Sequence, residues 1–301
     1  MAAIARLVSR AAVDGLYYGL MTRFPSAAPA LSRSVAAGLS AFAPAMVRTL
    51  EENARLALGP DASDESVRRC ARTVLLRMQE SIRGTLLSGD RTVAELADAV
   101  RSFSGQDGYH RVRDSGRGLL VASIHMGAFE PCLALLRRYE ERINVLFHAD
   151  PMPRFEAARS ALRSSIGVVE HRMNDGLDAW VSLRDALGRG EVVVMHADRS
   201  LGGLGGSRMP FLGAEDAVLP TGPVRLALAC GAAIVPTFCF ESRHGLCVRM
   251  DEPIDFPQQV LRGSEVAEHP AQRMLVRSME RAIRDNPDQW LAFWRVRGGG
   301  R

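Results

Sequence analysis

The chain beyond residue 105 alternates short apolar runs with amphipathic stretches. Residues 118–124 form an apolar run behind the turn-rich residues 114–117 and predict a buried strand, and residues 131–138 carry leucines at helical spacing. Further strands are expected at residues 143–147, 166–170, 192–196, 234–240 and 246–250. Further helices are expected at residues 154–163, 177–187, 222–230 and 275–286. This alternation predicts an α/β fold, a mixed sheet flanked by helices.

The first hundred residues predict a helical amino-terminal extension without a catalytic motif. Residues 1–24 place apolar side chains on one helical face but are interrupted by arginines, so they are amphipathic rather than membrane-spanning. Residues 27–46 are rich in Ala, Leu and Phe, but Pro29 and Pro44 among other residues interrupt them. A helix at residues 65–87 carries a core-facing stripe.

Two interpretations of residues 1–46 remain open. They either lie in the membrane interface as an anchor or pack on the catalytic core, because amphipathicity does not distinguish lipid from protein. We divide the chain into a helical, membrane-associating region, residues 1–105, and an α/β core, residues 106–301. The two form one globular unit.

The composition excludes some chemistry. All 38 basic residues are arginine and none is lysine, which excludes Schiff-base catalysis and a phosphate-binding loop of the P-loop type. The net charge of +4 permits attraction to an anionic membrane surface or to an acidic carrier, and no nucleic-acid partner is expected. The five cysteines contain no C-x-x-C pair, so we expect reduced core residues in a cytosolic compartment.

His125 and Glu130 are the candidate catalytic residues. His125 falls at the end of the predicted strand and Glu130 in the first turn of the helix that follows, which in open α/β sheets is where ligand crevices form. A carboxylate there can hold one imidazole nitrogen protonated and leave the other free to accept a proton. The alternative is a core histidine at a helix cap, with Glu130 offsetting the helix dipole.

Residues 123–130 resemble the H-x4-D/E motif of the glycerolipid acyltransferase superfamily, and later segments resemble one branch of it, the bacterial late acyltransferases of lipid A biosynthesis. The segments appear in the family's order over residues 50–297. They are N-A-R-L-A-L-G-P at residues 53–60, E-V-V-V-M-H-A-D-R at 191–199, P-F-L-G at 210–213, P-T-G-P at 220–223, G-A-A-I-V-P at 231–236 and the closing segment 287–295. Each segment alone is weak support for the family, and the complete set in this order is strong support.

The resemblance implies a fatty acyl transfer from a thioester of acyl carrier protein or coenzyme A to a hydroxyl of a lipid or glycolipid. His125 is then the base and Glu130 the acid that orients it. No metal or redox cofactor is implied. Without a G-x-S-x-G motif or a Cys–His pair, direct attack by the acceptor fits better than an acyl-enzyme. The resemblance implies the cytoplasmic face of the bacterial inner membrane. Because no segment offers about twenty uninterrupted apolar residues, we expect a peripheral protein.

Four further residues are substrate-binding candidates. Asp198 matches the family position after a strand, and Arg199 beside it is suited to a headgroup phosphate, although a plain strand-end turn is the alternative. His148 stands where related enzymes tend to have an arginine, so we expect that contact to be altered or taken by Arg154. The other five histidines, His196 among them, are expected to be structural.

Other functions remain open. The same chemistry can serve another acceptor, such as a phospholipid, an inositol glycolipid, or an aryl or amino-acid lipid. A non-catalytic lipid- or protein-binding module on the same fold belongs to a different class, and the His125/Glu130 pair argues against it. A hydrolase that activates water with the same pair is a third possibility. The glycine-rich residues 201–207 predict a loop, with phosphate contact or gating as alternatives.

Overall fold

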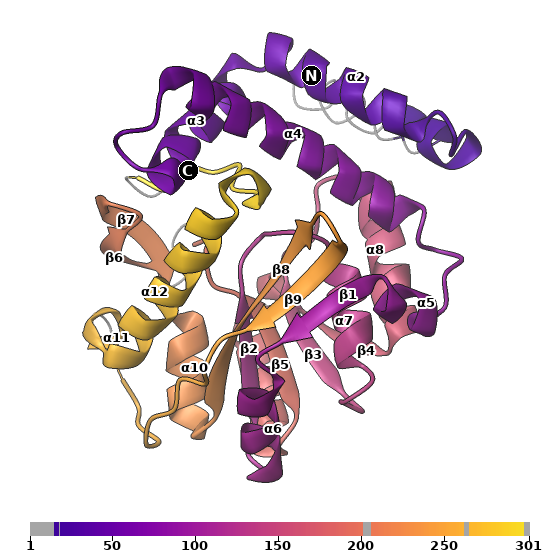
Figure 1. Ribbon diagram of the computed structural model, residues 1–301. Helices are drawn as coiled ribbons and strands as arrows, with labels where there is room; N and C mark the ends of the chain where they lie inside the picture. The colour runs from indigo at the N-terminus through magenta and orange to yellow at the C-terminus, as the bar shows by residue number, and fades with distance from the viewer. Residues whose placement is uncertain (1–14, 18, 201–205, 262–264, 298–301) are drawn as a thin grey trace, which may run out of the picture.

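A seven-stranded mixed sheet forms the centre of the protein in the computed structural model, which describes residues 15–17, 19–200, 206–261 and 265–297 (Figure 1). The strand order is β1-β9-β8-β2-β5-β3-β4. The strands are β1 (Val100–Ser104), β2 (Leu119–Ser123), β3 (Ile143–Phe147), β4 (Val168–Arg172), β5 (Val192–His196), β8 (Ala233–Ser242) and β9 (Gly245–Met250). β8 and β9 are antiparallel, and the other neighbouring pairs are parallel. This confirms the predicted fold class.

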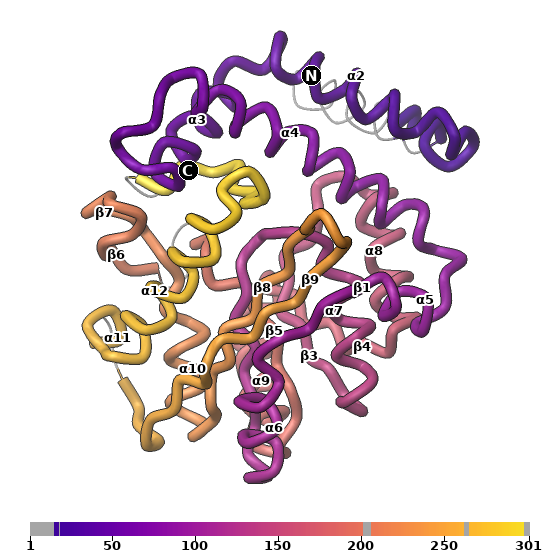
Figure 2. Tube along the Cα trace, in the orientation of Figure 1, coloured from indigo at the N-terminus to yellow at the C-terminus, as the bar shows by residue number. Residues whose placement is uncertain are grey.

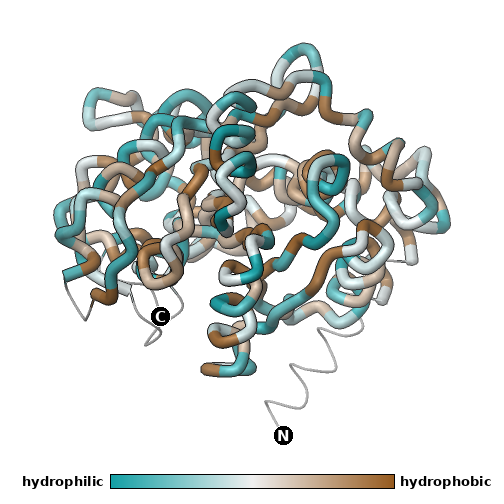
Figure 3. The backbone as a smooth tube through the Cα atoms, turned by 90° about the horizontal axis from the view of Figure 1, so that it is seen from below, coloured by the Kyte–Doolittle hydropathy of each residue, from teal (hydrophilic) through white to brown (hydrophobic). Residues whose placement is uncertain are grey.

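Helices cover both faces of this sheet because the central strands are buried on both sides. In β2, Leu120 and Ala122 join the core on one face, and Leu119 and Val121 join the core on the other. The first core includes α9 (Leu177–Gly188), α10 (Gly222–Cys230) and α12 (Pro270–Asp285). The second includes α5 (Val93–Asp98), α6 (Gln106–Asp114), α7 (Phe129–Leu136) and α8 (Pro153–Ile166). The tube in Figure 3 alternates hydrophobic and hydrophilic positions along the chain, as one-sided burial of helices requires.

The amino-terminal part is helical, as predicted. It consists of α2 (Ala28–Phe42), α3 (Pro44–Leu58) and α4 (Asp64–Leu86), and α4 runs across the edge of the sheet in Figure 1. Within the described parts of the chain, no one helix has the length and apolar composition to cross a membrane, and α2 with α3 has them only as a pair bent by 97°. Most of the predicted amphipathic segment, residues 1–14, lies outside the described residues.

The carboxyl-terminal segment after α12 returns to the amino-terminal helices (Figure 2). Asn53 on α3, which is buried, donates hydrogen bonds to the carbonyl oxygens of Ala292 and Trp294, both at 2.8 Å. The backbone N–H of Leu291 donates to the carbonyl oxygen of His125 at 2.7 Å. This segment therefore ties α3 to the loop that carries His125.

Several elements differ from the sequence expectations. β4 begins at Val168 rather than at residue 166, because α8 continues to Ile166 and Gly167 caps it in the left-handed conformation. The glycine-rich stretch is outside the described residues at positions 201–205, and Gly206 begins a hairpin of β6 (Gly206–Phe211) and β7 (Ala214–Pro220). The remaining short elements are α11 (Glu265–Glu268) and the 3₁₀ turns η1 (Met173–Asp175) and η2 (Pro287–Gln289).

The expectation that all cysteines are reduced is wrong for one pair. Cys132 on α7 and Cys239 on β8 form a disulfide, although 107 residues separate them in sequence. Packing of α7 on the sheet brings the two together, which spacing along the chain does not reveal. Cys70, Cys230 and Cys247 are free thiols.

β1 is part of the sheet, so the sheet begins shortly before residue 106. The division into a helical region, residues 1–105, and a core, residues 106–301, stays a prediction.

Candidate active site

His125 lies at the carboxyl edge of the sheet, where the chain leaves β2 and turns into α7. β2 and β5 are parallel neighbours with Ser123 opposite His196, so the segments that follow them meet at this edge. Gly127 makes the turn with a φ of 64°, and a Cβ atom there would lie 2.5 Å from the carbonyl oxygen of Cys239. A side chain at this position is therefore excluded by both conformation and space.

Asp198, from the chain after β5, holds His125. Its Oδ1 accepts a hydrogen bond from Nδ1 of the imidazole at 2.8 Å, and its Oδ2 accepts one from the backbone N–H of His125 at 3.0 Å. The indole N–H of Trp290 donates to the same Oδ2 at 2.9 Å. Asp198 is only 1 % exposed, so these three donors fix its carboxylate.

Asp198 is ionised under ordinary conditions. Burial alone would raise the pKa of its carboxyl, but the charge and hydrogen bond of His125, together with the hydrogen bond from Trp290, lower that pKa to about 2. A carboxylate at Nδ1 keeps the proton on that nitrogen and leaves Nε2 of the ring to accept one. Nε2 has no hydrogen-bond partner among the described residues, and the side chain is 34 % exposed.

The structure does not bring Glu130 to the ring of His125, where the sequence motif placed it. Glu130 is 6 % exposed and forms an ion pair with Arg159 of α8, at 3.6 Å. The physical reason is its position in the first turn of α7, which packs against α8, while the neighbouring strand β5 supplies the nearer carboxylate. Glu130 still lines a cavity together with His125, and its part in catalysis stays a prediction.

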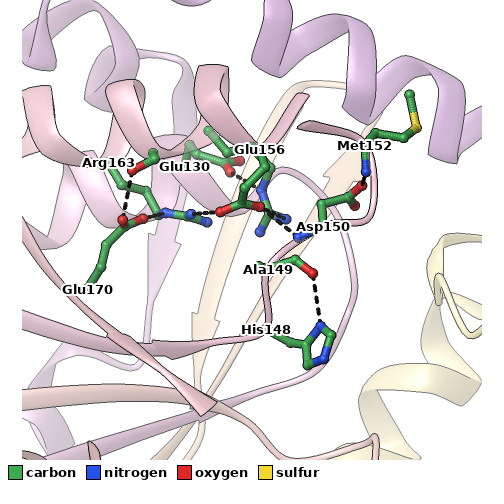
Figure 4. Close-up of polar contacts among 10 residues, drawn as sticks. Glu130, His148, Ala149, Asp150, Met152, Glu156, Arg163 and Glu170 are labelled. Atoms are coloured by element: carbon green, nitrogen blue, oxygen red, sulfur yellow. Dashed lines mark hydrogen bonds and ion pairs between the residues drawn. The ribbon is translucent and has the colours of Figure 1, made fainter. Parts of the chain in front are cut away.

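The ion pair of Glu130 belongs to a larger buried network on α8 (Figure 4). Arg159 also lies 3.8 Å from Glu156, which accepts a hydrogen bond from Nη2 of Arg163 at 3.0 Å. Arg163 is fully buried and pairs through Nε with Glu170 of β4. Removal of one member of such an ion pair destabilises the fold, because the other charge then stays buried without a partner.

The same network positions the loop after β3. Glu156 accepts a hydrogen bond from the backbone N–H of Asp150 at 2.9 Å, and the guanidinium of Arg163 lies 4.5 Å from the ring centre of Phe147. His148 stands in this loop and donates from Nδ1 to the carbonyl oxygen of Ala149 at 2.9 Å (Figure 4). Glu130 is thereby linked, through α8, to the loop that carries His148.

Two cavities meet at His125. One, of about 250 Å³, lies toward β3 and α9 and is bordered by Trp180 and by His148. The other, of about 280 Å³, lies under α4 and the carboxyl-terminal segment and is more apolar. Its apolar side chains include Met78, Ile82, Phe155, Phe293 and Trp294. Both cavities share six residues, namely His125, Phe129, Asp150, Arg159, His196 and Arg199.

Of the four substrate-binding candidates, Arg199 and His148 border these cavities, and Asp198 and Arg154 do not. Arg199 lies over the ring of Trp294 at 5.2 Å from its centre and borders both cavities. Asp198 instead holds the imidazole of His125. Arg154 donates to the carbonyl oxygen of Gly15 at 3.4 Å, so it contacts the amino-terminal segment. In the described part of the chain, no cluster of three histidine, cysteine or acidic residues is placed to hold a metal ion.

His196, which the sequence predicts to be structural, lies directly against the candidate base His125. Its ring stacks on that of His125 with 4.1 Å between centres and 29° between planes, and it lies 4.9 Å from the ring of Phe129. The sequence shows that His196 ends the strand that leads to Asp198. Its contact with His125, however, depends on β5 lying next to β2, and local sequence patterns do not predict that strand order.

We expect His196 to make the folded protein sensitive to mild acid. Desolvation of its ring, together with the nearby His125 and Arg159, lowers the pKa of His196 from 6.5 to about 3, against the attraction of Asp198. Between these values the unfolded chain binds a proton that the folded protein does not. The free energy of unfolding should therefore fall as the pH drops below about 6.5, by up to about 1.4 kcal/mol per pH unit from this group.

Urea unfolding at pH 7, 6 and 5 checks this expectation, with the His196→Gln variant as comparison. The variant should lose less stability between pH 6.5 and 5 than the wild type does. Burial also lowers the pKa of His171, and that group contributes to both proteins alike. Asp198 does not contribute in this range, because it is ionised in both the folded and the unfolded state. If the free energy of unfolding falls equally with pH in the wild type and in His196→Gln, the low pKa of His196 is contradicted.

Comparison with known families gives one match over most of the chain. The family model described as bacterial lipid A biosynthesis acyltransferase matches residues 14–296. The matched span contains both strand ends of the site and the carboxyl-terminal segment that closes it. No curated protein matches the chain.

Proposed function

The chain belongs to the bacterial lipid A biosynthesis acyltransferase family, and we propose that it moves a fatty acyl chain from a thioester of acyl carrier protein or coenzyme A to a hydroxyl of a lipid A-like glycolipid. The observation that carries the proposal is the hydrogen bond between Nδ1 of His125 and Asp198, which leaves Nε2 free at the junction of two cavities. A base with one nitrogen held and the other open fits proton removal from a bound hydroxyl.

The proposed reaction needs no covalent acyl-enzyme. Nε2 of His125 takes the proton of the acceptor hydroxyl while the oxygen attacks the thioester carbonyl carbon. The resulting oxyanion collapses, the carbon–sulfur bond breaks, and the imidazolium returns the proton to the leaving sulfur. Asp198 stabilises the imidazolium between these two transfers and keeps the ring in one orientation.

The two cavities support a division of labour between the substrates. The cavity under α4 is bordered by apolar side chains and suits the acyl chain. The cavity toward α9 offers Trp180, His148 and Arg199 to the headgroup of the acceptor. Arg199 is the residue we expect to contact a phosphate, since its guanidinium has no acidic partner among the described residues.

We place the protein as a peripheral protein at the cytoplasmic face of the inner membrane. Exposed apolar side chains on the amino-terminal side support membrane contact, with Phe42 at the end of α2 88 % exposed and Phe24 51 % exposed. Aromatic rings at such positions suit the headgroup zone of a bilayer. The net charge of +4 adds attraction to anionic lipids.

A transfer assay with a defined donor tests the proposal. Purified protein, acyl carrier protein thioester or acyl-coenzyme A, and a lipid A precursor are incubated, and mass spectrometry follows the lipid. We expect a mass gain of one acyl group per molecule and one thiol released per ester formed. Total lipids of cells without the gene should lack that acyl chain on lipid A.

The same assay separates the other functions. Thiol release with free fatty acid but without an acylated lipid identifies a hydrolase. Acylation of another lipid class in total extracts assigns a different acceptor. A wild-type protein that binds lipid but turns over neither thioester is a binding module, and the proposal is then wrong.

A further inference from the structure

His196 is a polar neighbour of the catalytic imidazole that the reaction above does not use. It ends β5, directly opposite Ser123 of β2, and its ring stacks on His125 with 4.1 Å between the centres. It is half-buried and borders both cavities that meet at His125. Any substrate that reaches Nε2 of His125 from either cavity therefore passes beside this second ring.

The ring nitrogens of His196 have no hydrogen-bond partner among the described residues. No hydrogen bond to its imidazole is formed by the described residues, whereas the ring of His125 is held by Asp198 and that of His171 by Asn144 at 3.0 Å. A polar ring without a partner at a cavity wall is a group with hydrogen-bonding capacity left for a ligand.

The ring of His196 is also neutral at physiological pH, because its pKa is lowered to about 3. A neutral imidazole carries one N–H donor, and it cannot compete with His125 as a base at that pKa. The titratable and charged groups that act on it are His125, Asp198 and Arg159. The surroundings of the two rings thus give them different roles: His125, held by Asp198, is the base, and the desolvated His196 is an uncharged donor.

We propose that His196 binds the carbonyl oxygen of the acyl thioester and donates a hydrogen bond to the oxyanion that develops there. This inference rests on the proposed function and adds a substrate-contacting residue to it. As the acceptor oxygen bonds to the carbonyl carbon, the π electron pair of the C=O bond moves to the carbonyl oxygen. The N–H of His196 stabilises that charge without transferring its proton, and the pair returns when the carbon–sulfur bond breaks.

The stacked arrangement of the rings supports this assignment. The attacking oxygen and the carbonyl oxygen are bonded to one carbon in the tetrahedral intermediate, so their hydrogen-bond partners have to lie side by side. His125 and His196 do so, with nearly parallel rings that border the same cavities. A donor aimed at the developing charge costs no reorganisation during the reaction.

Two variants of His196 separate a donor from a packing partner. His196→Gln keeps an N–H donor but loses the aromatic ring, whereas His196→Phe keeps a ring that can stack on His125 but has no donor. Loss of one oxyanion donor typically lowers kcat by about 10²- to 10³-fold. We expect His196→Phe to show such a loss with the KM of the acceptor nearly unchanged, and His196→Gln to retain more activity than His196→Phe.

A binding measurement in the His125→Ala background, where turnover is slow, gives a second readout. Calorimetry compares the acyl thioester with its thioether analogue, which lacks the carbonyl oxygen. The protein with His196 should prefer the thioester, and the added His196→Phe change should abolish that preference. Circular dichroism melting confirms that each variant is folded.

The outcomes distinguish this inference from the function on which it rests. If the wild type transfers the acyl chain but His196→Phe is more active than His196→Gln, His196 is a stacking residue and not a donor. An unchanged preference for the thioester in the His196→Phe protein overturns the donor role in the same way. A wild-type protein that transfers no acyl chain contradicts the proposed function and this inference together. If His196→Phe loses more activity than His196→Gln and also loses the preference for the thioester, the results support both the proposed function and this inference.

Discussion

Replacement of His125 by alanine should lower kcat by about 10²- to 10⁴-fold, the range typical of a positioned general base. The fold should survive, because the side chain borders two cavities and is 34 % exposed. Asp198 loses the ring as a partner, but the backbone N–H of residue 125 and the indole of Trp290 still donate to its carboxylate. Steady-state transfer assays and thermal melting measure the two effects separately.

His110→Ala is the matched control for this variant. His110 lies on α6, where its ring packs on those of Tyr109 and Tyr139, and it borders neither cavity at His125. We expect near wild-type kcat in that protein. If His125→Ala unfolds the chain or leaves thioester turnover intact, His125 is a core residue, and the catalytic assignment fails.

The strands that carry the site could be located from sequence because each is a short apolar run bounded by turn residues. β3 and β5 have the predicted bounds, and α10 has as well. Burial on both faces removes polar residues from such strands, so the run itself marks them. β1 was missed for the opposite reason, since it lies at the edge of the sheet and is mostly exposed.

The partner of His125 could not be found in the same way. Asp198 follows His125 by 73 residues and contacts it only because β5 inserts between β2 and β3 in the sheet. Strand order is a property of the whole fold, and local spacing does not encode it. The H-x4-E spacing therefore favoured Glu130, the carboxylate nearest to His125 in sequence, whereas in the structure Asp198 contacts the ring.

The disulfide and the α8 network were missed for a related reason. Cys132 meets Cys239 only when α7 packs on the sheet, and Glu130 meets Arg159 only when α7 packs on α8. Both contacts join segments that are remote in sequence. The neutral state of His196 is a consequence of the same packing, since its desolvation depends on the fold around it.

Asp198→Asn and Glu130→Gln together decide which carboxylate orients the base, and the first should have nearly as large an effect as His125→Ala. An amide at position 198 can donate to Nδ1 of His125, which leaves the proton on Nε2, where the base must be free. In a Ser-His-Asp triad the corresponding change lowers kcat by about 10⁴-fold with the geometry intact, and we expect a loss of similar size in acyl transfer.

Glu130→Gln should cost less than either His125→Ala or Asp198→Asn, because it weakens the ion pair with Arg159 but leaves the ring of His125 held by Asp198. Asp255→Asn is the control for removal of a carboxylate. Asp255 pairs with Arg117 near the other end of the sheet, where an exposed ion pair contributes about 0–1 kcal/mol to stability.

The double variant His125→Ala/Asp198→Asn completes the test. It should be little worse than His125→Ala alone, since a base and the acid that orients it lose their contributions together. Additive losses would mean that Asp198 acts independently of His125. A larger loss in Glu130→Gln than in Asp198→Asn would return the orienting role to Glu130, as the sequence motif predicted, and would require the ring of His125 to change partners when substrate binds.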